Sequence, residues 1–258
     1  PTIEHNVLFS GANDQGAFAL SLSSLTDNGI IIGSTLKRMS LNFNGGLNVG
    51  KNFKLSLNTS AYNVNTTSPY TDPGSGSITS QSSAGLLQRF VGVSPTVRYS
   101  NDTSGAMLPG PNDNTLGNPA YWSTLYVNNN NEQRFTGSLN AEYTILPYLK
   151  VIASTSGFMR YGGSNAFTKS YIQGNGGSLN TTRPGSFSNY NDIQYSYNAF
   201  LQFDKQFKDH KLTVMAGGEY LDYKRYIFSG SAQGAPTDLI PWLTADPSPT
   251  IINGALAY

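Results

Sequence analysis

Five aromatic residues could contact a ligand: Tyr99, Tyr121, Trp122 and Tyr126 lie among many asparagines in one long connection, and Trp242 lies near the C-terminal end. Aromatic faces beside amide groups suit sugar rings and peptide backbones alike, and ligand contacts concentrate on loops. The alternative is that these rings pack together and anchor the connection through a small core of its own. The residue types leave both interpretations open.

Residues that could carry catalysis are sparse. The two histidines, His5 and His210, lie far apart, at an expected strand start and in an expected short turn, and their spacing does not indicate a zinc site. Neither a G-x-S-x-G elbow nor a P-loop is present. The glycine-rich run 174–178 lacks the lysine and the following helix of a phosphate loop. We therefore expect a protein that is not an enzyme and has no catalytic residue.

Two oxygen-rich clusters could bind calcium, namely Asn-Asp-Thr at 101–103 and Asn-Asp-Asn at 112–114. The same residue types often form Asx-turns, and this alternative stays open. Cysteine is absent, which excludes disulfides, thiolate metal sites and thiol catalysis. We expect no cofactor and no resident metal, with calcium at these clusters as the open alternative.

The composition narrows the class of protein. Charged residues make up 12% of the 258 residues, about half the share in an ordinary soluble domain. The net charge of +1 provides no basic field for nucleic acid. No apolar run is long enough for a transmembrane helix. Low charge, 27 glycines and many tyrosines fit a membrane β-barrel, which needs apolar residues on only half of each strand.

Alternation of apolar and polar residues is the dominant pattern, and it predicts about eight strands in four hairpins. The best strands span on the order of 10–13 residues, longer than the roughly 5–6 of globular strands and sufficient for a tilted membrane strand of roughly 9–11. The expected strand pairs are 6–11 with 18–25, 39–49 with 53–61, 134–145 with 149–160, and 193–204 with 212–220.

The connections alternate between short and long. Short turns are expected at 12–15, 50–52, 146–148 and 208–210, and long connections at 63–131, 162–190 and 227–258, with a shorter one at 26–36. Outer-membrane barrels place tight turns on the periplasmic side and long loops outside. The pattern therefore predicts a segment of an antiparallel transmembrane β-barrel, one barrel domain over 1–258, with 63–131 as a long extracellular loop.

Aromatic residues on the apolar side of the strands form two groups, which fit the two interfacial belts of a membrane barrel. High β-propensity of aromatic residues is the alternative explanation. The group near the short turns and then the group near the long connections are Phe53, Tyr143 and Phe203, and Tyr161, Tyr195 and Tyr197.

Several segments, in this order along nearly the whole chain, are similar to one family of transporters. They are His5–Gly11, Phe18–Leu25, Asp27–Ile31, Lys37–Asn42, Val93–Tyr99, Gly117–Pro119, Glu142–Ile145 and Lys211–Glu219. Together they resemble the start of the barrel in SusC/RagA-like TonB-dependent transporters, which are nutrient importers of the Bacteroidota outer membrane.

The resemblance implies a barrel of about 22 strands plugged from within, of which this chain would supply the early third. It further implies membrane lipid around the wall, TonB acting through a plug domain before Pro1, a SusD-like surface lipoprotein over the long loops, and an oligosaccharide or peptide as substrate. The chain opens without an initiating methionine or secretory sequence and has no plug and no later strands, so we expect a processed or truncated piece of a larger barrel. Five charged side chains would crowd the lumen of an eight-stranded barrel: Lys54, Arg134, Glu142, Lys150 and Arg160.

Two other functions stay open at this point. A passive porin-like or structural barrel would share the wall but need no plug. A soluble, extracellular all-β binding or adhesin module could bury the same apolar rows inside a sandwich.

Overall fold

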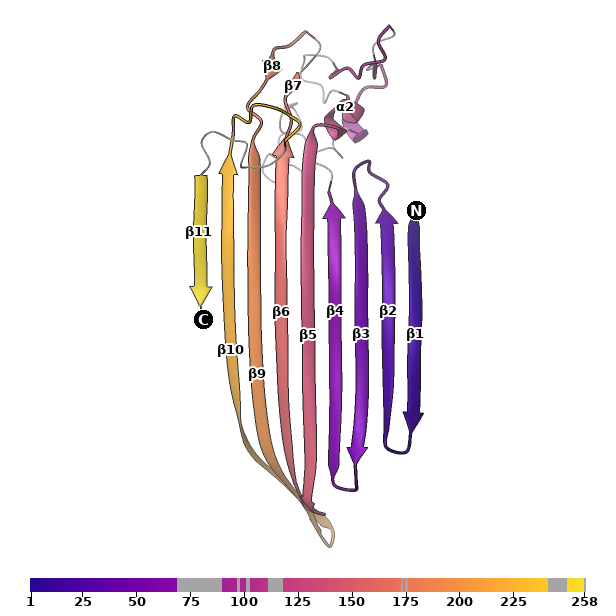
Figure 1. Ribbon diagram of the computed structural model, residues 1–258, viewed down its shortest axis with the longest axis vertical. Coiled ribbons are helices and arrows are strands. Elements are labelled where there is room, and N and C mark those ends of the chain that lie inside the picture. Colours follow the sequence, from indigo (N-terminus) through magenta and orange to yellow (C-terminus); the bar gives the residue numbers. More distant parts are fainter. Residues whose placement is uncertain are drawn as a thin grey trace.

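The computed structural model describes residues 1–68, 90–96, 98–100, 103–110, 118–172, 174, 176–240 and the backbone of 250–257. Within these residues, nine strands form one antiparallel sheet in the order β1-β2-β3-β4-β5-β6-β9-β10-β11 (Figure 1). They are β1 (Thr2–Asn13), β2 (Gly16–Asn28), β3 (Thr35–Val49), β4 (Phe53–Thr67), β5 (Tyr126–Leu146), β6 (Leu149–Thr168), β9 (Gly185–Phe207), β10 (His210–Ala232) and β11 (Thr250–Ala257).

A few small elements lie beyond one end of the sheet, where the long connections gather (Figure 1). They are the one-turn helix α2 (Pro119–Ser123) and the two-stranded pair of β7 (Tyr171–Ile172) and β8 (Leu179–Asn180). Among the described residues, no helix is both long enough and apolar enough to cross a membrane.

The register of the strands separates the sheet into two faces. Leu22, Leu41, Ala61 and Phe135 stand directly opposite one another on β2 to β5, so they form one transverse row. Because successive side chains of a strand point to opposite sides, the next residues along each strand form a polar row on the other side. We call the two sides the apolar face and the polar face.

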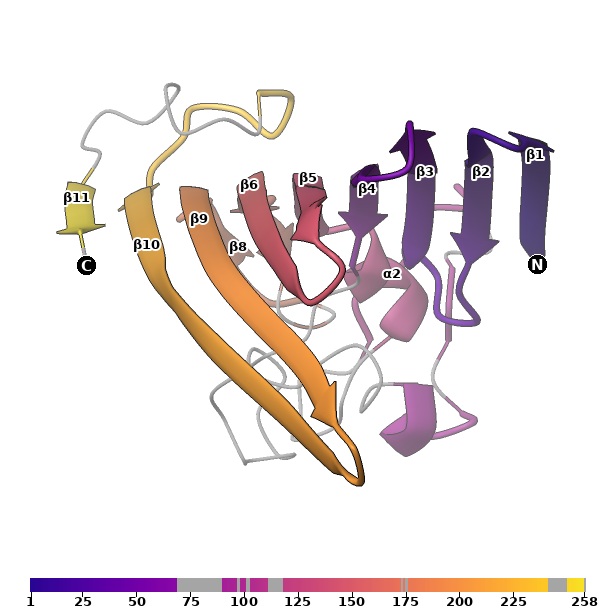
Figure 2. The ribbon, with the colours of Figure 1, turned by 90° about the horizontal axis from the view of Figure 1, so that it is seen from below.

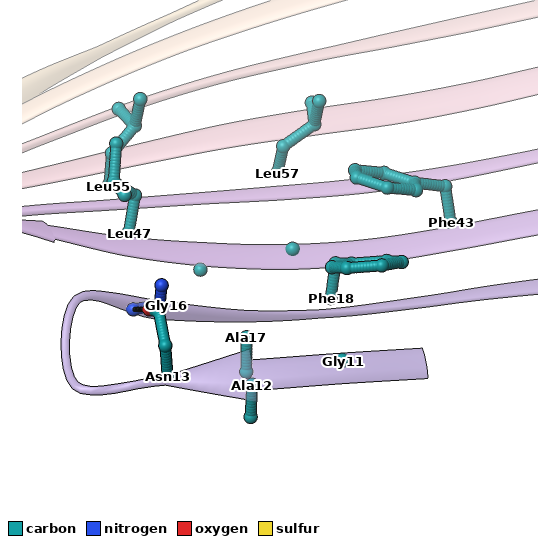
Figure 3. Close-up of a pocket in the computed structure, with 12 residues that line it drawn as sticks. Gly11, Ala12, Asn13, Gly16, Ala17, Phe18, Phe43, Leu47, Leu55 and Leu57 are labelled. Atoms are coloured by element: carbon teal, nitrogen blue, oxygen red, sulfur yellow. Dashed lines mark hydrogen bonds between the residues drawn. The ribbon is translucent and has the colours of Figure 1, made fainter. Parts of the chain in front are cut away.

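A close-up of the lower end of β1 to β4 shows the apolar face directly (Figure 3). Large apolar side chains stand on one side of the strands, whereas Ala12 points to the other side. The side chains on the apolar side are Phe18, Phe43, Leu47, Leu55 and Leu57.

The four short turns lie at the opposite end from the long loops, as predicted (Figure 1). Asn13 closes the first turn by accepting hydrogen bonds from the backbone N–H groups of Gln15 and Gly16 at 2.9 and 2.8 Å. Gly50 has a positive φ of 64°, which glycine adopts without strain. Lys208 has a φ of 51° in the turn between β9 and β10, a conformation that a side chain disfavours.

The strands run further than the alternating pattern predicts. β5, β6, β9 and β10 have 20 to 23 residues each, so the loop expected at 63–131 begins only after Thr67 and ends before Tyr126. The added residues, such as Asn128–Asn131, are polar on both faces and therefore lack the alternation that marks a strand in sequence. Backbone pairing with the neighbouring strand holds them in the sheet.

The expected connection 227–258 also contains more strand than predicted. β10 continues to Ala232, and β11 occupies Thr250–Ala257, where Asn253-Gly254 has the composition of a turn. β1 and β11 lie at opposite edges of the sheet, which does not close into a barrel within this chain (Figure 2). The fold is an antiparallel segment of a transmembrane β-barrel wall, with eight long strands in four hairpins.

Candidate functional site

Three of the predicted ligand-contacting residues form a small core in the loop region. Trp122 is fully buried, and the rings of Tyr121 and Tyr126 lie 6.0 and 6.5 Å from it between centroids. Tyr171, which was not among the predicted residues, packs against Trp122 at 5.2 Å. Leu125 and Ile31 complete the cluster. Trp122 therefore offers no surface to a ligand in this arrangement, and its neighbours hold the loop together.

Asn118 fixes the segment that carries these rings. It is fully buried and caps α2, accepting a hydrogen bond from the Ala120 N–H at 3.0 Å. Its side-chain amide donates to the carbonyl oxygens of Tyr99 and Leu108 at 2.9 and 2.7 Å. Asn118 thereby ties the segment of Tyr99 to the aromatic core, while the Tyr99 side chain itself is exposed.

A second set of contacts joins the connection after β6 to the one after β10. The Asp238 carboxylate accepts hydrogen bonds from the Ser170 N–H at 2.8 Å and from the Arg183 side chain at 2.6 Å. Partial burial alone would raise the pKa of Asp238, but the hydrogen bonds from Ser170 and the charge of Arg183 outweigh it, so this pKa lies below its ordinary value. Hydrogen bonds to Asp238 thus connect these two loops to each other beyond the end of the sheet.

The hydroxyl of Tyr121 links the aromatic core to β7. It accepts a hydrogen bond from the Ile172 N–H at 2.8 Å. Burial raises the pKa of the Tyr121 phenol, against a smaller opposite effect of that hydrogen bond. Ligand contact by Tyr99, Tyr121 and Tyr126 stays a prediction, and Trp242 lies outside the described residues.

The polar face carries a group of side chains below these loops that the sequence did not single out. Glu132 on β5 accepts a hydrogen bond to each carboxylate oxygen, from the hydroxyl of Tyr62 at 2.9 Å and from that of Tyr190 at 2.6 Å. Tyr62 comes from the adjacent strand β4, whereas Tyr190 comes from β9, with β6 in between. Both oxygens of one carboxylate are therefore held by phenols from opposite sides.

Tyr190 reaches Glu132 only because the intervening strand has a glycine at the crossing. Gly162 pairs with both Glu132 and Tyr190 in the register. A Cβ atom at Gly162 would overlap the hydroxyl of Tyr190 and would lie 3.0 Å from the carbonyl oxygen of Asn131. The position therefore requires glycine for close passage of a neighbouring side chain.

One row nearer the short turns, charged side chains continue across the strands. Arg160 and Asp192 stand opposite each other, and the guanidinium of Arg160 lies 2.6 Å from the Asp192 carboxylate, which is almost fully buried. Arg225 approaches the other carboxylate oxygen to 3.4 Å. Arg134 lies in the same row, with its guanidinium 4.7 Å above the ring of Phe158. Phe158 breaks the alternation in sequence, and this cation–π contact accounts for its place on the polar face.

Glu132, Tyr62 and Tyr190 border a hollow of about 600 Å³ on the polar face, which we call the Glu132 pocket. Its other contributors are one arginine, one aliphatic floor residue and small polar side chains: Arg38, Val64, Thr66, Asn130, Ser164 and Ser188, beside Tyr62 and Tyr190. Arg38 makes no ion pair within the described part of the chain, so its charge is available to a ligand. Hydroxyls, an amide and two opposite charges suit a polar, hydrogen-bonding solute.

Sequence patterning placed the charged residues of this region on the correct side of the sheet but could not group them. Arg134 and Arg160 were expected in the interior, and both lie on the polar face together with Lys54, Glu142 and Lys150, whose ammonium group lies 3.6 Å from Glu142. Glu132, Tyr190 and Asp192 were missed because their contacts depend on the register of three separate strands.

The structure gives no group of three or more metal-ligating side chains among the described residues. Most of the two oxygen-rich clusters considered for calcium, residues 101–102 and 112–114, lies outside the described residues.

The fold matches solved structures of outer-membrane transport proteins. The RagAB peptide transporter gives a TM-score of 0.71 at 15% identity, covering 98% of this chain and 28% of that chain. The RagAB peptide importer in its "open-open" state gives 0.72 at 14% identity, with 98% and 28% covered. BauA, the ferric preacinetobactin receptor from Acinetobacter baumannii, gives 0.55 at 12% identity, with 98% and 31% covered.

At these identities the likeness concerns the fold alone, and the chain spans less than a third of the length of the structures it matches. No protein-family model matches the sequence, and a comparison with curated proteins finds no match either.

Proposed function

We propose that the chain forms part of the wall and outer vestibule of a TonB-dependent active importer of oligosaccharides or peptides in the outer membrane of a Bacteroidota-type bacterium. The observation that carries this proposal is the Glu132 pocket, a polar hollow on the inner face of a barrel wall, directly below tied loops. In a membrane barrel the apolar face meets lipid and the polar face lines the lumen.

The charge of this inner region favours solutes with anionic or strongly polar groups. Four arginines on β3 to β10, including Arg38 and Arg134, accompany only two carboxylates, Glu132 and Asp192, so positive charge is in excess. Arginine binds carboxylates and carbonyl groups through paired donors. Uronic acids in oligosaccharides and the C-terminal carboxylates of peptides would both find such partners here.

The importer would act with partners outside this chain. Energy would come from TonB through a plug domain, and a SusD-like surface lipoprotein would cover the loops that carry Tyr99 and Trp122. Catalysis is assigned to no residue, and no cofactor is assigned to the chain. The role of the tied loops would be to shape the entrance, and that of the Glu132 pocket to contact the solute inside it.

Uptake by whole cells tests the proposal. A fluorescent oligosaccharide and a fluorescent peptide pool would be offered to cells with the full-length gene, without it, and with it in a background lacking TonB. We expect uptake of one probe class to need both the gene and TonB. Uptake that persists without TonB would instead identify a passive porin, and no gene-dependent uptake of either class would contradict transport of these solutes.

Variants of the pocket connect uptake to the site. Arg38→Gln and Arg38→Leu each remove the positive charge that the pocket offers without changing the strand pairing, and each should lower uptake at limiting substrate about tenfold, the effect of one lost charge-assisted hydrogen bond. Lys51→Gln, in the short turn at the far end of the sheet, is the matched charge control and should leave uptake unchanged. If the pocket variants behave like Lys51→Gln, the Glu132 pocket does not contact the solute.

Protease treatment of intact cells tests whether the long loops face the outside of the cell and the short turns face the periplasm. Cleavage is expected in the connections 69–125 or 169–184, and the short turns at Lys51 and Lys208 should be cut only after the outer membrane is opened. The experiment is repeated without the capping lipoprotein, because that partner would mask the loops. Cleavage at Lys51 or Lys208 on intact cells, with the long loops untouched in both strains, would reverse the proposed topology.

A further inference from the structure

The outward-facing side of β1 to β4 has a second hollow, distinct from the Glu132 pocket and on the opposite face of the sheet. It has a volume of about 620 Å³. Leu41, Ala61 and Phe135 form its floor as three successive members of one transverse row. Ala61 is small and stands between two large side chains, so the surface is lowered at this point. The floor of the hollow is apolar and faces the membrane.

Polar side chains border the same hollow on the side of the long loops. Directly above the apolar row, His5 on β1 faces Ser24 on β2, which in turn faces Met39 on β3. One further step along the same face, Thr26 on β2 faces Lys37 on β3. Adjacent strands lie about 4.8 Å apart, so these four polar side chains occupy one small area on three neighbouring strands.

This area carries positive charge that no nearby carboxylate among the described residues neutralises. Lys37 is exposed and has no carboxylate partner in the described part of the chain. Among the outward side chains in the upper halves of β1 to β4, no carboxylate occurs, because Glu4 and Asp27 point to the polar face, where Asp27 accepts a hydrogen bond from Thr2 at 2.6 Å. His5 and Ser24 line the hollow, and Thr26 and the positive charge of Lys37 stand one step beyond its edge, toward the long loops.

From this arrangement we propose that the outward face binds an anionic, phosphate-bearing lipid of the surrounding membrane. The acyl chain lies in the hollow over Ala61, and the phosphate lies over Ser24 and Thr26, between Lys37 and His5. An ammonium group with neighbouring hydroxyls is a common recognition set for phosphate, and charge complementarity selects an acidic headgroup over a zwitterionic one. The site depends on the membrane-facing fold and is independent of the solute that the importer carries.

The largely apolar hollow near the short turns provides a contrast on the same face. It is lined by Phe18, Phe43 and Leu57 around glycines and contains no cationic side chain (Figure 3). An acyl chain could rest there, but nothing in its lining distinguishes one headgroup from another. The charge-selective site is therefore assigned to the upper hollow alone.

Native mass spectrometry of the full-length protein in detergent tests the site, with phosphatidylglycerol and phosphatidylcholine of equal chain length as probes. We expect the wild-type protein to retain phosphatidylglycerol several-fold more than phosphatidylcholine. Lys37→Gln should abolish this preference by lowering phosphatidylglycerol retention to the level of phosphatidylcholine, whose own retention stays unchanged. Lys37→Arg should keep the preference, and Lys51→Gln, outside the site, should behave as wild type. Ala61→Phe fills the hollow and should lower the retention of both lipids.

Equal retention of the two lipids by the wild-type protein would overturn the proposal. So would an unchanged preference in Lys37→Gln. Inorganic phosphate is added as a competitor, because the same side chains could recognise either a lipid headgroup or free phosphate. If phosphate at millimolar concentration binds the delipidated protein and displaces phosphatidylglycerol, the site recognises free phosphate and the assignment to a lipid is wrong.

Discussion

The two faces of this sheet are built from the same strands but are stabilised in different ways. On the apolar face, rings rest on glycines: the ring of Phe18 lies over Gly11, and the ring of Phe135 lies 3.4 Å from the place of a Cβ at Gly137. On the polar face, side chains are held by directed contacts, as Glu132 is held by two phenols. The apolar face needs bulk and low polarity, whereas the polar face needs particular partners at particular positions.

This difference assigns the two faces to different surroundings. Phe135 and Leu139 are 44% and 38% exposed, and such a continuous exposed apolar surface is unfavourable in water but favourable in lipid. The polar face instead pairs several of its charges internally, as Asp192 with Arg160, and keeps hydroxyls, amides and the charge of Arg38 available. Selectivity for a solute can therefore arise only on the polar face, while the apolar face can recognise only components of the membrane.

The largest expected effect comes from placing a charge on the apolar face. Leu41→Arg or Leu139→Arg should destabilise the inserted barrel by about 2–4 kcal/mol if these residues lie near the bilayer midplane. Asn42→Arg and Asn140→Arg, the neighbours on the polar face, should cost much less because their side chains meet water. Urea titration of the protein folded into vesicles measures both sets, and equal sensitivity would remove the distinction between the faces.

A smaller effect is expected from filling a glycine position on each face. Gly162→Ala displaces the Tyr190 hydroxyl from Glu132 and should cost about 1–3 kcal/mol, the penalty of an unmade hydrogen bond to a charged group. Gly137→Ala, on the apolar face, meets only ordinary contact with the Phe135 ring and should change the stability by less than about 1 kcal/mol. The same folding titration compares the pair. If Gly162→Ala destabilises the protein no more than Gly137→Ala does, the hydrogen bond that Tyr190 makes across β6 contributes nothing to stability.

The smallest effect concerns the loops above the polar face and depends on pH. Since the folded-state pKa of Asp238 lies below its ordinary value of 3.8, its contacts with Ser170 and Arg183 stabilise the loops fully above that value. This stabilisation is lost as the pH falls through the lowered pKa. We expect hydrogen-exchange protection in 169–184 to fall below about pH 4 while protection of β5 and β6 stays constant. In Asp238→Asn the loop protection should be low and independent of pH, and a wild-type loop that keeps its protection at low pH would contradict this role.

Much of the wall could be predicted from the sequence, because a strand between lipid and water must alternate. Met39–Val49 alternates without interruption, and its register with β2 and β4 places the apolar and polar residues on the expected sides. The strand at Asn128–Asn131 was not predicted, because polar residues stand on both of its faces and the sequence therefore shows no alternation. Prediction also failed at β11, where Asn253-Gly254 has the composition of a turn but lies within a strand.

The sites could be predicted only in part. Aromatic composition located the loop residues but could not distinguish a core from a binding surface, and Trp122 is in the core. The Glu132 pocket could not be predicted, because Tyr62 and Tyr190 are 128 residues apart in the chain and meet at one carboxylate only through the strand order. Gly162 falls in the connection predicted at 162–190, whereas it lies within β6 and lets the side chain of Tyr190 pass.

The central claim is that one face of this sheet meets lipid and the other meets water, and spin-label accessibility along β5 tests it most directly. Because the chain has no cysteine, single cysteines can be introduced at each position from 133 to 143 without background from this segment. In vesicles, we predict oxygen accessibility to peak at Phe135, Leu139 and Tyr143 and to fall at the intervening polar-face residues, including Ser138. A flat profile, or one with the peaks on the polar-face residues, would contradict the account.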